Sequence, residues 1–249
     1  MRTLKIGKHN VEMFDSIEDL PITRFHKYNK MLMIDAGLGS DLTDVDAHIE
    51  KVIAFMREGN NEDAIGELMN WRQAIYFVQM NLSPKHLAFA SLVTKIDGKP
   101  YNDLSDDGLA KVINVLNDTK RSEVVDTLSE AKKKINEELR TYFPMQFDDS
   151  ETKEYYDLLK QRTMRTLEAI INDKGWEDVT AATNKLLTFK KPTKFNGTDS
   201  IEVESDINFE KMCLMLAQHL NVDAKKMTTL AFYNAYHYLR EQNKKQKKR

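Results

Sequence analysis

MIDAGLGSDLTDVD, residues 33–46, holds two glycines and four aspartates and lies between two apolar helical patterns. It does not fit a calcium loop, because a loop that starts at Asp41 has no glycine at its sixth position and lacks the alternate oxygen ligands. It does not fit a phosphate loop, because GxGxxG and Gly-Lys-Ser/Thr are both missing and the carboxylates would repel phosphate. The stretch therefore predicts a joint between two helices.

The helix before the joint is expected to start near Pro21, which suits a first helical turn. Apolar residues recur after it at spacings of three and four, as at Ile22, Phe25 and Leu32. Gly37 follows this run directly, and we expect it to take the left-handed conformation that ends a helix.

The helix after the joint is expected to be capped by Asp41 or Thr43. Thr43 with Asp46 three residues later resembles a capping box, and an acidic first turn suits the helix dipole. One face of this helix carries Val45, Ile49, Val52, Ile53 and Met56.

The rest of the chain predicts an all-α protein, mainly a helical bundle. Glycine and proline are scarce, at nine and five residues, which argues against a fold of many tight turns. A short N-terminal β-hairpin is expected where Leu4, Ile6, Val11 and Met13 alternate around GKHN. Further helical patterns cover residues 61–81, 83–96, 104–118, 121–143, 150–173, 176–189, 208–220 and 227–245.

Two of these helices carry a clear signature. The helix over residues 83–96 opens with Ser83 at the N-cap and Pro84 at the first helical position. In the helix over residues 61–81 the apolar positions predict a buried face. These positions are Ile65, Leu68, Met69, Ile75, Tyr76 and Val78.

Three regions are expected along the chain. Residues 1–118 combine the hairpin with a compact helical module, and residues 119–190 hold a long helical hairpin. Residues 191–249 hold an extended arm, a C-terminal helical pair and a basic tail. The arm lies near residues 190–206, KKPTKFNGTDSIEVESD, whose alternating SIEVE favours one strand.

Composition excludes several classes of protein. With 41% hydrophobic residues the chain can bury a core, and its net charge of −2 gives no overall field that attracts nucleic acid or lipid. Cys213 is the single cysteine, which excludes an intramolecular disulfide and favours a reducing compartment. The N-terminus lacks a signal peptide, and no apolar run approaches the ~18 residues of a membrane span. A soluble protein made in the cytoplasm is expected.

No residue is assigned a catalytic, cofactor-binding or metal-binding role. The six histidines form no HExxH, no His-x-His and no pair three or four residues apart, and GxSxG, a Walker lysine and CxxC are all missing. Acidic pairs such as Asp106 and Asp107 precede helices, where N-terminal capping explains them.

Two C-terminal features are candidate contact sites. The tail is either a solvated helix end or a contact with a polyanion such as DNA. Aromatic residues in the last helix can stack on bases, or be buried against the preceding helix or a neighbouring subunit. The basic residues are Lys244, Lys245, Lys247, Lys248 and Arg249, and the aromatic ones are Phe232, Tyr233, Tyr236 and Tyr238.

Three segments resemble proteins of tailed bacteriophages. SIEDLPITRFHKYNKMLMIDAGLGSDLTDVDAHIEKVIAFM (residues 16–56) and NWRQAIYFVQMNLSPKHLAFASLVTKIDGKPYNDLSDDGLAKV (residues 70–112) look like an N-terminal module of proteins encoded among virion-structure and tail-assembly genes, particularly in the crAss-like group. NFEKMCLMLAQHLNVDAKKMTTLAFYNAYHYLRE (residues 208–241) resembles the helical ending of tail-assembly and connector-region proteins. Residues 120–206 lie outside the resemblance.

The resemblance implies a virion structural protein without catalysis or cofactor, a ring or adaptor component at the head–tail junction or tail. Its partners would be other phage structural proteins and copies of itself. The arm, through Phe195, Ile201 and Val203, is expected to reach a neighbouring subunit by strand addition, and Phe232 and Tyr236 to contact one. The alternatives are a tail-assembly chaperone that is absent from the mature virion, and a nucleic-acid-binding regulator or small enzyme.

Overall fold

The N-terminal hairpin belongs to a small antiparallel sheet. The computed structural model describes residues 1–38, 45–79, 83–144, 150–195 and 200–246. Strands β1 (Arg2–Ile6) and β2 (His9–Met13) confirm the predicted hairpin. Two further strands, β3 (Val93–Ile96) and β4 (Lys99–Pro100), extend the sheet in the order β1-β2-β3-β4.

The added strands correct the prediction of a single helix over residues 83–96. Helix α4 (Pro84–Leu92) starts as predicted, with Ser83 at the N-cap position, but it ends where β3 begins. Asp97 and Gly98 then take φ values of 50° and 79°, as the two central residues of a tight hairpin turn require. The Asp-Gly dipeptide after a β-branched run was the sequence signal for this second hairpin.

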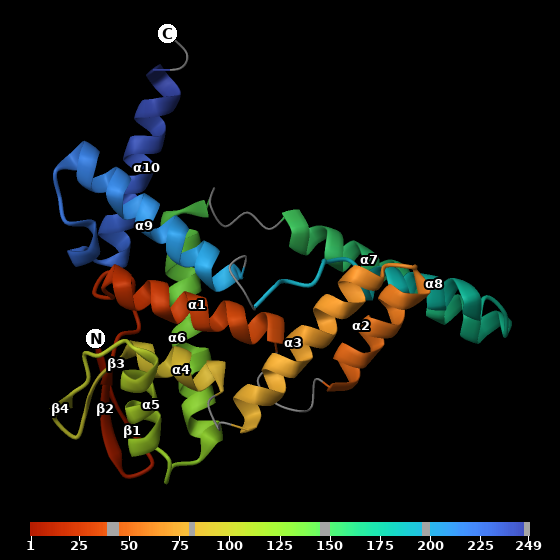
Figure 1. Ribbon diagram of the computed structural model, residues 1–249, viewed down its shortest axis with the longest axis horizontal. Helices are drawn as coiled ribbons and strands as arrows, with labels where there is room; N and C mark the ends of the chain where they lie inside the picture. The colour runs from red at the N-terminus through yellow and green to blue at the C-terminus, as the bar shows by residue number, and fades with distance from the viewer. Residues whose placement is uncertain (39–44, 80–82, 145–149, 196–199, 247–249) are drawn as a thin grey trace.

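The main hydrophobic core lies between the sheet and the helices around it (Figure 1). Helix α1 packs along α4 and also contacts α9, η3 and α10, while α4 contacts α5 and α6. The largest fully buried side chains include Tyr28, Phe89 and Phe232. The elements are α1 (Ile22–Leu38), α5 (Asp106–Val115), α6 (Arg121–Tyr142), α9 (Ile201–Leu220), α10 (Thr229–Gln246) and the 3-10 turn η3 (Ala224–Lys226).

A buried guanidinium ties α1 to the sheet. Arg24 donates hydrogen bonds to the carbonyls of Ser91 (3.0 Å), Val93 (2.8 Å) and Tyr101 (2.7 Å). These carbonyls belong to the end of α4, to β3 and to the segment after β4. One side chain therefore satisfies backbone acceptors at the point where the chain changes from helix to strand.

Four helices form a second lobe that extends away from the main core (Figure 1). They pair as two hairpins, α2 with α3 and α7 with α8, and α2 contacts α8. The long helical hairpin expected from residues 121–143 and 150–173 is not the pairing found, because α7 pairs with α8, whereas α6 packs on α4 in the main core. Their bounds are α2 (Val45–Arg57), α3 (Asn61–Gln79), α7 (Ser150–Asn172) and α8 (Trp176–Leu187).

Residues 191–195, here called the strap, connect α8 to the main core. Pro192 passes Gly66 of α3, where an added Cβ would lie 3.4 Å from the Pro192 Cβ. At the other end of the strap, the ring of Phe195 is buried against Gly37 of α1. The strap therefore passes over α3 at Gly66 and over α1 at Gly37.

The left-handed conformation predicted for Gly37 is wrong. Helix α1 continues through Gly37 to Leu38, and the residues with positive φ in the described ranges do not include Gly37. The glycine is needed for close packing, because a side chain there would occupy the space of the Phe195 ring. The predicted caps at Asp41 and Thr43 lie outside the described residues.

Helix α9 corrects the predicted strand in the arm. It begins at Ile201, with Ser200 at the N-cap accepting a hydrogen bond from the Val203 amide. Glu202 and Glu204 lie in its first turn, where acidic side chains favour helix over strand. The all-α class with a small N-terminal sheet is confirmed. Within the described ranges, none of the helices has the length and apolarity needed to cross a bilayer.

Candidate assembly surface

Helix α3 buries its small and polar side and exposes its apolar side. Its buried residues are Ala64, Glu67, Asn70 and Ala74. The side predicted to be buried is at the surface, with Ile65 58% exposed. Leu68, Met69, Tyr76 and Val78 are exposed as well. The prediction of a buried apolar face was wrong because the small residues, not the large ones, make the close contact between helices.

An ion pair compensates for the burial of the polar side of α3. His48 of α2 and Glu67 of α3 are both buried, with His48 Nδ1 2.5 Å from Glu67 Oε1. His48 Nε2 donates to the Leu38 carbonyl at 3.2 Å, so both ring nitrogens carry protons when Glu67 is ionised. The neighbouring Glu67 carboxylate raises the pKa of His48, against the opposing effect of burial. Lys51 Nζ lies 3.7 Å from the same carboxylate.

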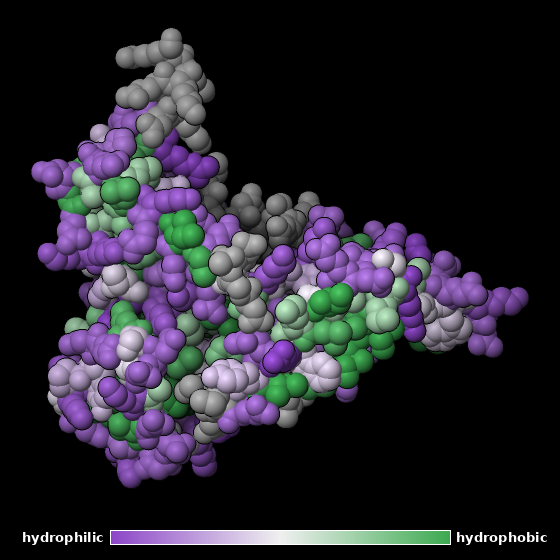
Figure 2. Space-filling model, viewed as in Figure 1, coloured by the Kyte–Doolittle hydropathy of each residue, from purple (hydrophilic) through white to green (hydrophobic). Residues whose placement is uncertain are grey.

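The apolar surface of α3 continues onto α2. Figure 2 shows hydrophobic side chains gathered over this hairpin in the lobe that projects from the main core. Monomeric proteins rarely expose a continuous apolar patch of more than a few hundred Å², so a patch across two helices is a candidate contact surface. We call it the α2–α3 face, made of Ile49, Ile53, Met56, Ile65, Leu68, Met69 and Tyr76.

The α7–α8 hairpin carries a second exposed apolar surface. Along the part of α7 whose side chains are described, residues 154–172, only Ala169 is buried. Ile171 is 78% exposed at the end of α7, and Trp176 is exposed at the start of α8. We call this surface the α7–α8 face, made of Tyr156, Met164, Leu167, Ile170, Ile171 and Trp176.

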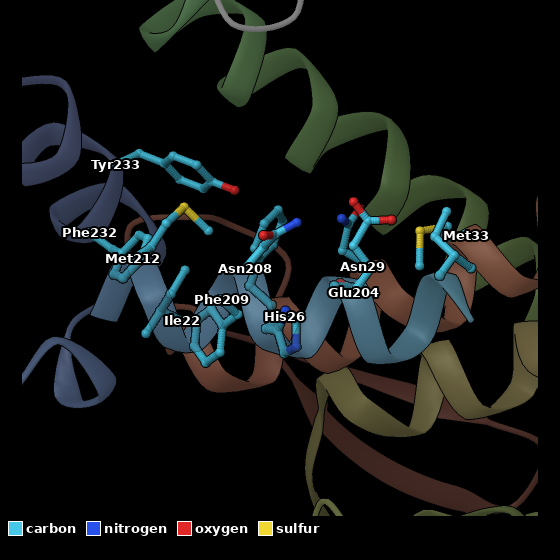
Figure 3. A pocket seen from close by; sticks show the side chains of 13 residues that line it. Ile22, His26, Asn29, Met33, Glu204, Asn208, Phe209, Met212, Phe232 and Tyr233 are labelled. Atoms are coloured by element: carbon cyan, nitrogen blue, oxygen red, sulfur yellow. The ribbon is translucent and has the colours of Figure 1, made fainter. Parts of the chain in front are cut away.

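A groove of about 330 Å³ lies between α1, α9 and α10. Figure 3 shows Tyr233, Asn208, Asn29 and Glu204 following one another along it. Burial raises the pKa of the Tyr233 hydroxyl to about 12, so this phenol stays protonated near neutral pH. None of these side chains forms a nucleophile–base pair, and the groove is best described as a cleft where α9 and α10 meet α1.

The rings of two further histidines, His26 and His9, make structural contacts. His26, at the groove, stacks on Phe209 with ring centroids 4.2 Å apart, and its Nε2 lies 2.8 Å from Asp206 Oδ1. His9 lies between two carboxylates, with Nδ1 2.6 Å from Asp97 Oδ2 and Nε2 3.2 Å from Asp118. The hydrogen bond to Asp97 raises the pKa of His9. No ring nitrogen of His9 is left free to act as a base.

The residues predicted to contact a partner do not form an exposed surface. Phe195 and Phe232 are buried in the main core, and Ile201 and Tyr236 are partly buried against it. Val203, at 39% exposure, is the one member of this set at the surface. Phe195 and Phe232 are therefore covered by the chain itself and offer no exposed surface to a partner.

The basic tail is described only in part. Helix α10 extends through Lys244 and Lys245, and Lys247, Lys248 and Arg249 lie outside the described residues. In the ranges that the structure describes, no three His, Cys, Asp or Glu side chains are grouped as metal ligands. Comparison of the chain with models of protein families, with curated proteins and with solved structures finds no match.

Proposed function

We propose that this protein is a structural component of a tailed-phage virion, at the head–tail junction or tail, which acts by binding other protein chains and not by catalysis. The observation that carries the proposal is the second lobe. Its buried residues include Phe55 and the alanines Ala54, Ala64, Ala169 and Ala182, whereas many of its large apolar side chains are exposed.

Burial in a partner explains this inversion physically. Fully burying an exposed large apolar side chain contributes roughly 1.5–3 kcal/mol. The half-exposed side chains of this lobe would each contribute part of that amount on assembly. A resemblance to virion-structure and tail-assembly proteins, in the segments 16–56, 70–112 and 208–241, supports a phage particle as the place of assembly.

Mass spectrometry of purified particles of the phage that encodes the chain tests the proposal. A ring component is expected at a fixed copy number, on the order of a dozen for a closed ring. The variant Leu68→Lys places a charge on the α2–α3 face, and Leu214→Lys, on the exposed side of α9, is its matched control. Loss of the first variant from particles, with retention of the second, supports the proposal.

A tail-assembly chaperone is the second candidate, because an exposed apolar surface also suits a protein that holds an unfinished partner and then leaves. Absence of the wild-type chain from particles, despite expression during infection, refutes the structural role and favours the chaperone. A DNA-binding regulator would instead show binding that weakens steeply with salt.

A further inference from the structure

The second lobe carries two apolar faces of similar size on different hairpins. The α2–α3 face has seven large side chains between 38% and 60% exposed, and the α7–α8 face has six between 50% and 78% exposed. Taking about 190 Å² for a fully exposed large side chain, each offers on the order of 600 Å². A stable interface needs roughly 800 Å² from each partner, so either face supplies most of one.

Two different apolar faces on one chain favour a head-to-tail contact. A two-fold dimer in which the α2–α3 face pairs with itself would leave the α7–α8 face of every copy in water. A head-to-tail contact covers both, because each copy offers one face to the copy before it and the other face to the copy after it. Such contacts repeat around a ring when the rotation closes.

One pair of charged residues beside each face also occurs in opposite order of sign. On α3, Glu62 and Arg72 are exposed and, at 1.5 Å per residue, lie about 15 Å apart along the helix. On α7, Lys160 and Glu168 are exposed and lie about 12 Å apart in the reverse order of sign. Both line a hollow of about 490 Å³ along α7, beside Met164. Parallel alignment of the two helices therefore brings Glu62 to Lys160 and Arg72 to Glu168.

From these observations we propose that copies of this chain assemble head to tail, with the α2–α3 face of one copy docked on the α7–α8 face of the next. The inference rests on the proposed assembly function and specifies its interface. The exposed ring of Tyr76 on the first face and those of Tyr156 and Trp176 on the second are of the residue types that contribute most to protein interfaces.

Complementation between variants tests the proposal by sedimentation of the full chain. Leu68→Lys disables the α2–α3 face, Leu167→Lys disables the α7–α8 face, and Leu214→Lys is the control. We expect wild type and the control to form oligomers larger than a dimer, and each face variant alone to be monomeric. An equimolar mixture of the two face variants is expected to give dimers and nothing larger, because one intact face of each kind remains in the mixture.

Several results would overturn the proposal. A wild-type chain that stays monomeric excludes a second copy as the occupant, and a mixture that stays monomeric excludes pairing of unlike faces. Capture of a different virion protein on the α2–α3 face of a monomeric chain would do so as well. Circular dichroism checks that each variant has kept its helices.

A charge reversal provides a second test with conservative surface changes. Arg72→Glu is expected to weaken assembly about tenfold by placing two carboxylates together, and the added change Glu168→Lys is expected to restore it. The pairing of Arg72 with Glu168 is refuted if the double variant assembles no more tightly than Arg72→Glu alone. Failure of the inference is distinguishable from failure of the proposed function, since a chain can be monomeric in solution yet present in particles, or assemble yet be absent from them.

Discussion

Two helical glycines that lie under the strap respond in opposite directions to the same substitution. In Gly37→Ala, the new Cβ falls 2.6 Å from Phe195 Cε2, closer than real Cβ contacts, so the buried ring must leave its site. Displacing a buried Phe costs about 3 kcal/mol, and replacing helical Gly by Ala returns about 1 kcal/mol. The expected net loss in free energy of unfolding is about 2 kcal/mol.

Gly66→Ala is the matched control. Its Cβ would make an ordinary contact, 3.4 Å from the Pro192 Cβ, so only the helix propensity changes and stability rises by about 1 kcal/mol. Urea and thermal unfolding of both purified variants measure the difference. For a chain of this length, 1 kcal/mol shifts Tm by roughly 2–4 °C, which separates the two variants clearly.

A double variant identifies the cause. In a Phe195→Ala background the clash at Gly37 is gone, so Gly37→Ala is expected to become stabilising by about 1 kcal/mol, a coupling of about 3 kcal/mol between the two sites. A role for Gly37 in seating the Phe195 ring is refuted if Gly37→Ala leaves stability unchanged or destabilises equally in both backgrounds.

Three further outcomes are expected. The folded-state pKa of His48 is raised, so the stability that His48 contributes is complete below the unfolded value of 6.5 and is lost as pH rises through the folded pKa. The difference in unfolding free energy between wild type and His48→Gln should therefore shrink toward alkaline pH. A difference that does not change with pH would contradict this expectation. Arg24→Met leaves two buried carbonyls and one partly buried carbonyl without their donor and should destabilise by about 3 kcal/mol in urea unfolding, whereas an unchanged midpoint would show that the guanidinium is dispensable. Burial raises the pKa of the Cys213 thiol, so alkylation should be slow in the native protein and rapid in urea, and fast native labelling would exclude the buried position.

Local sequence signals determined most of the secondary structure. The alternation around GKHN predicted β1 and β2, and Ser83 with Pro84 marked the start of α4. The sequence of α6 carries an apolar stripe of Val124, Val125, Leu128, Ile135 and Leu139, and all of these except Val125 are buried. These features depend on backbone preference and side-chain period, which neighbouring residues set.

Where local sequence signals favour two different conformations, the secondary structure depends on tertiary contacts. SIEVE alternates like a strand, yet Ser200 caps a helix there and acidic residues fill its first turn. Gly37 follows an apolar run as a helix-ending glycine does, yet α1 continues through it because Phe195, far along the chain, fills the space above it. The sequence shows that a glycine is present but not which distant side chain needs the room.

The sequence by itself determined that α2, α3 and α7 each have an apolar side, because helical periodicity is a property of the segment alone. Only the tertiary structure decided that α3 turns Ala64, Glu67 and Asn70 inward and leaves Ile65 and Leu68 in water. The physical reason is that an apolar stripe favours burial, but the sequence of the helix does not specify whether the same chain or another molecule buries it. Small side chains and the His48–Glu67 pair let α2 and α3 pack closely on their polar sides, which leaves large apolar side chains such as Ile65 and Leu68 at the surface.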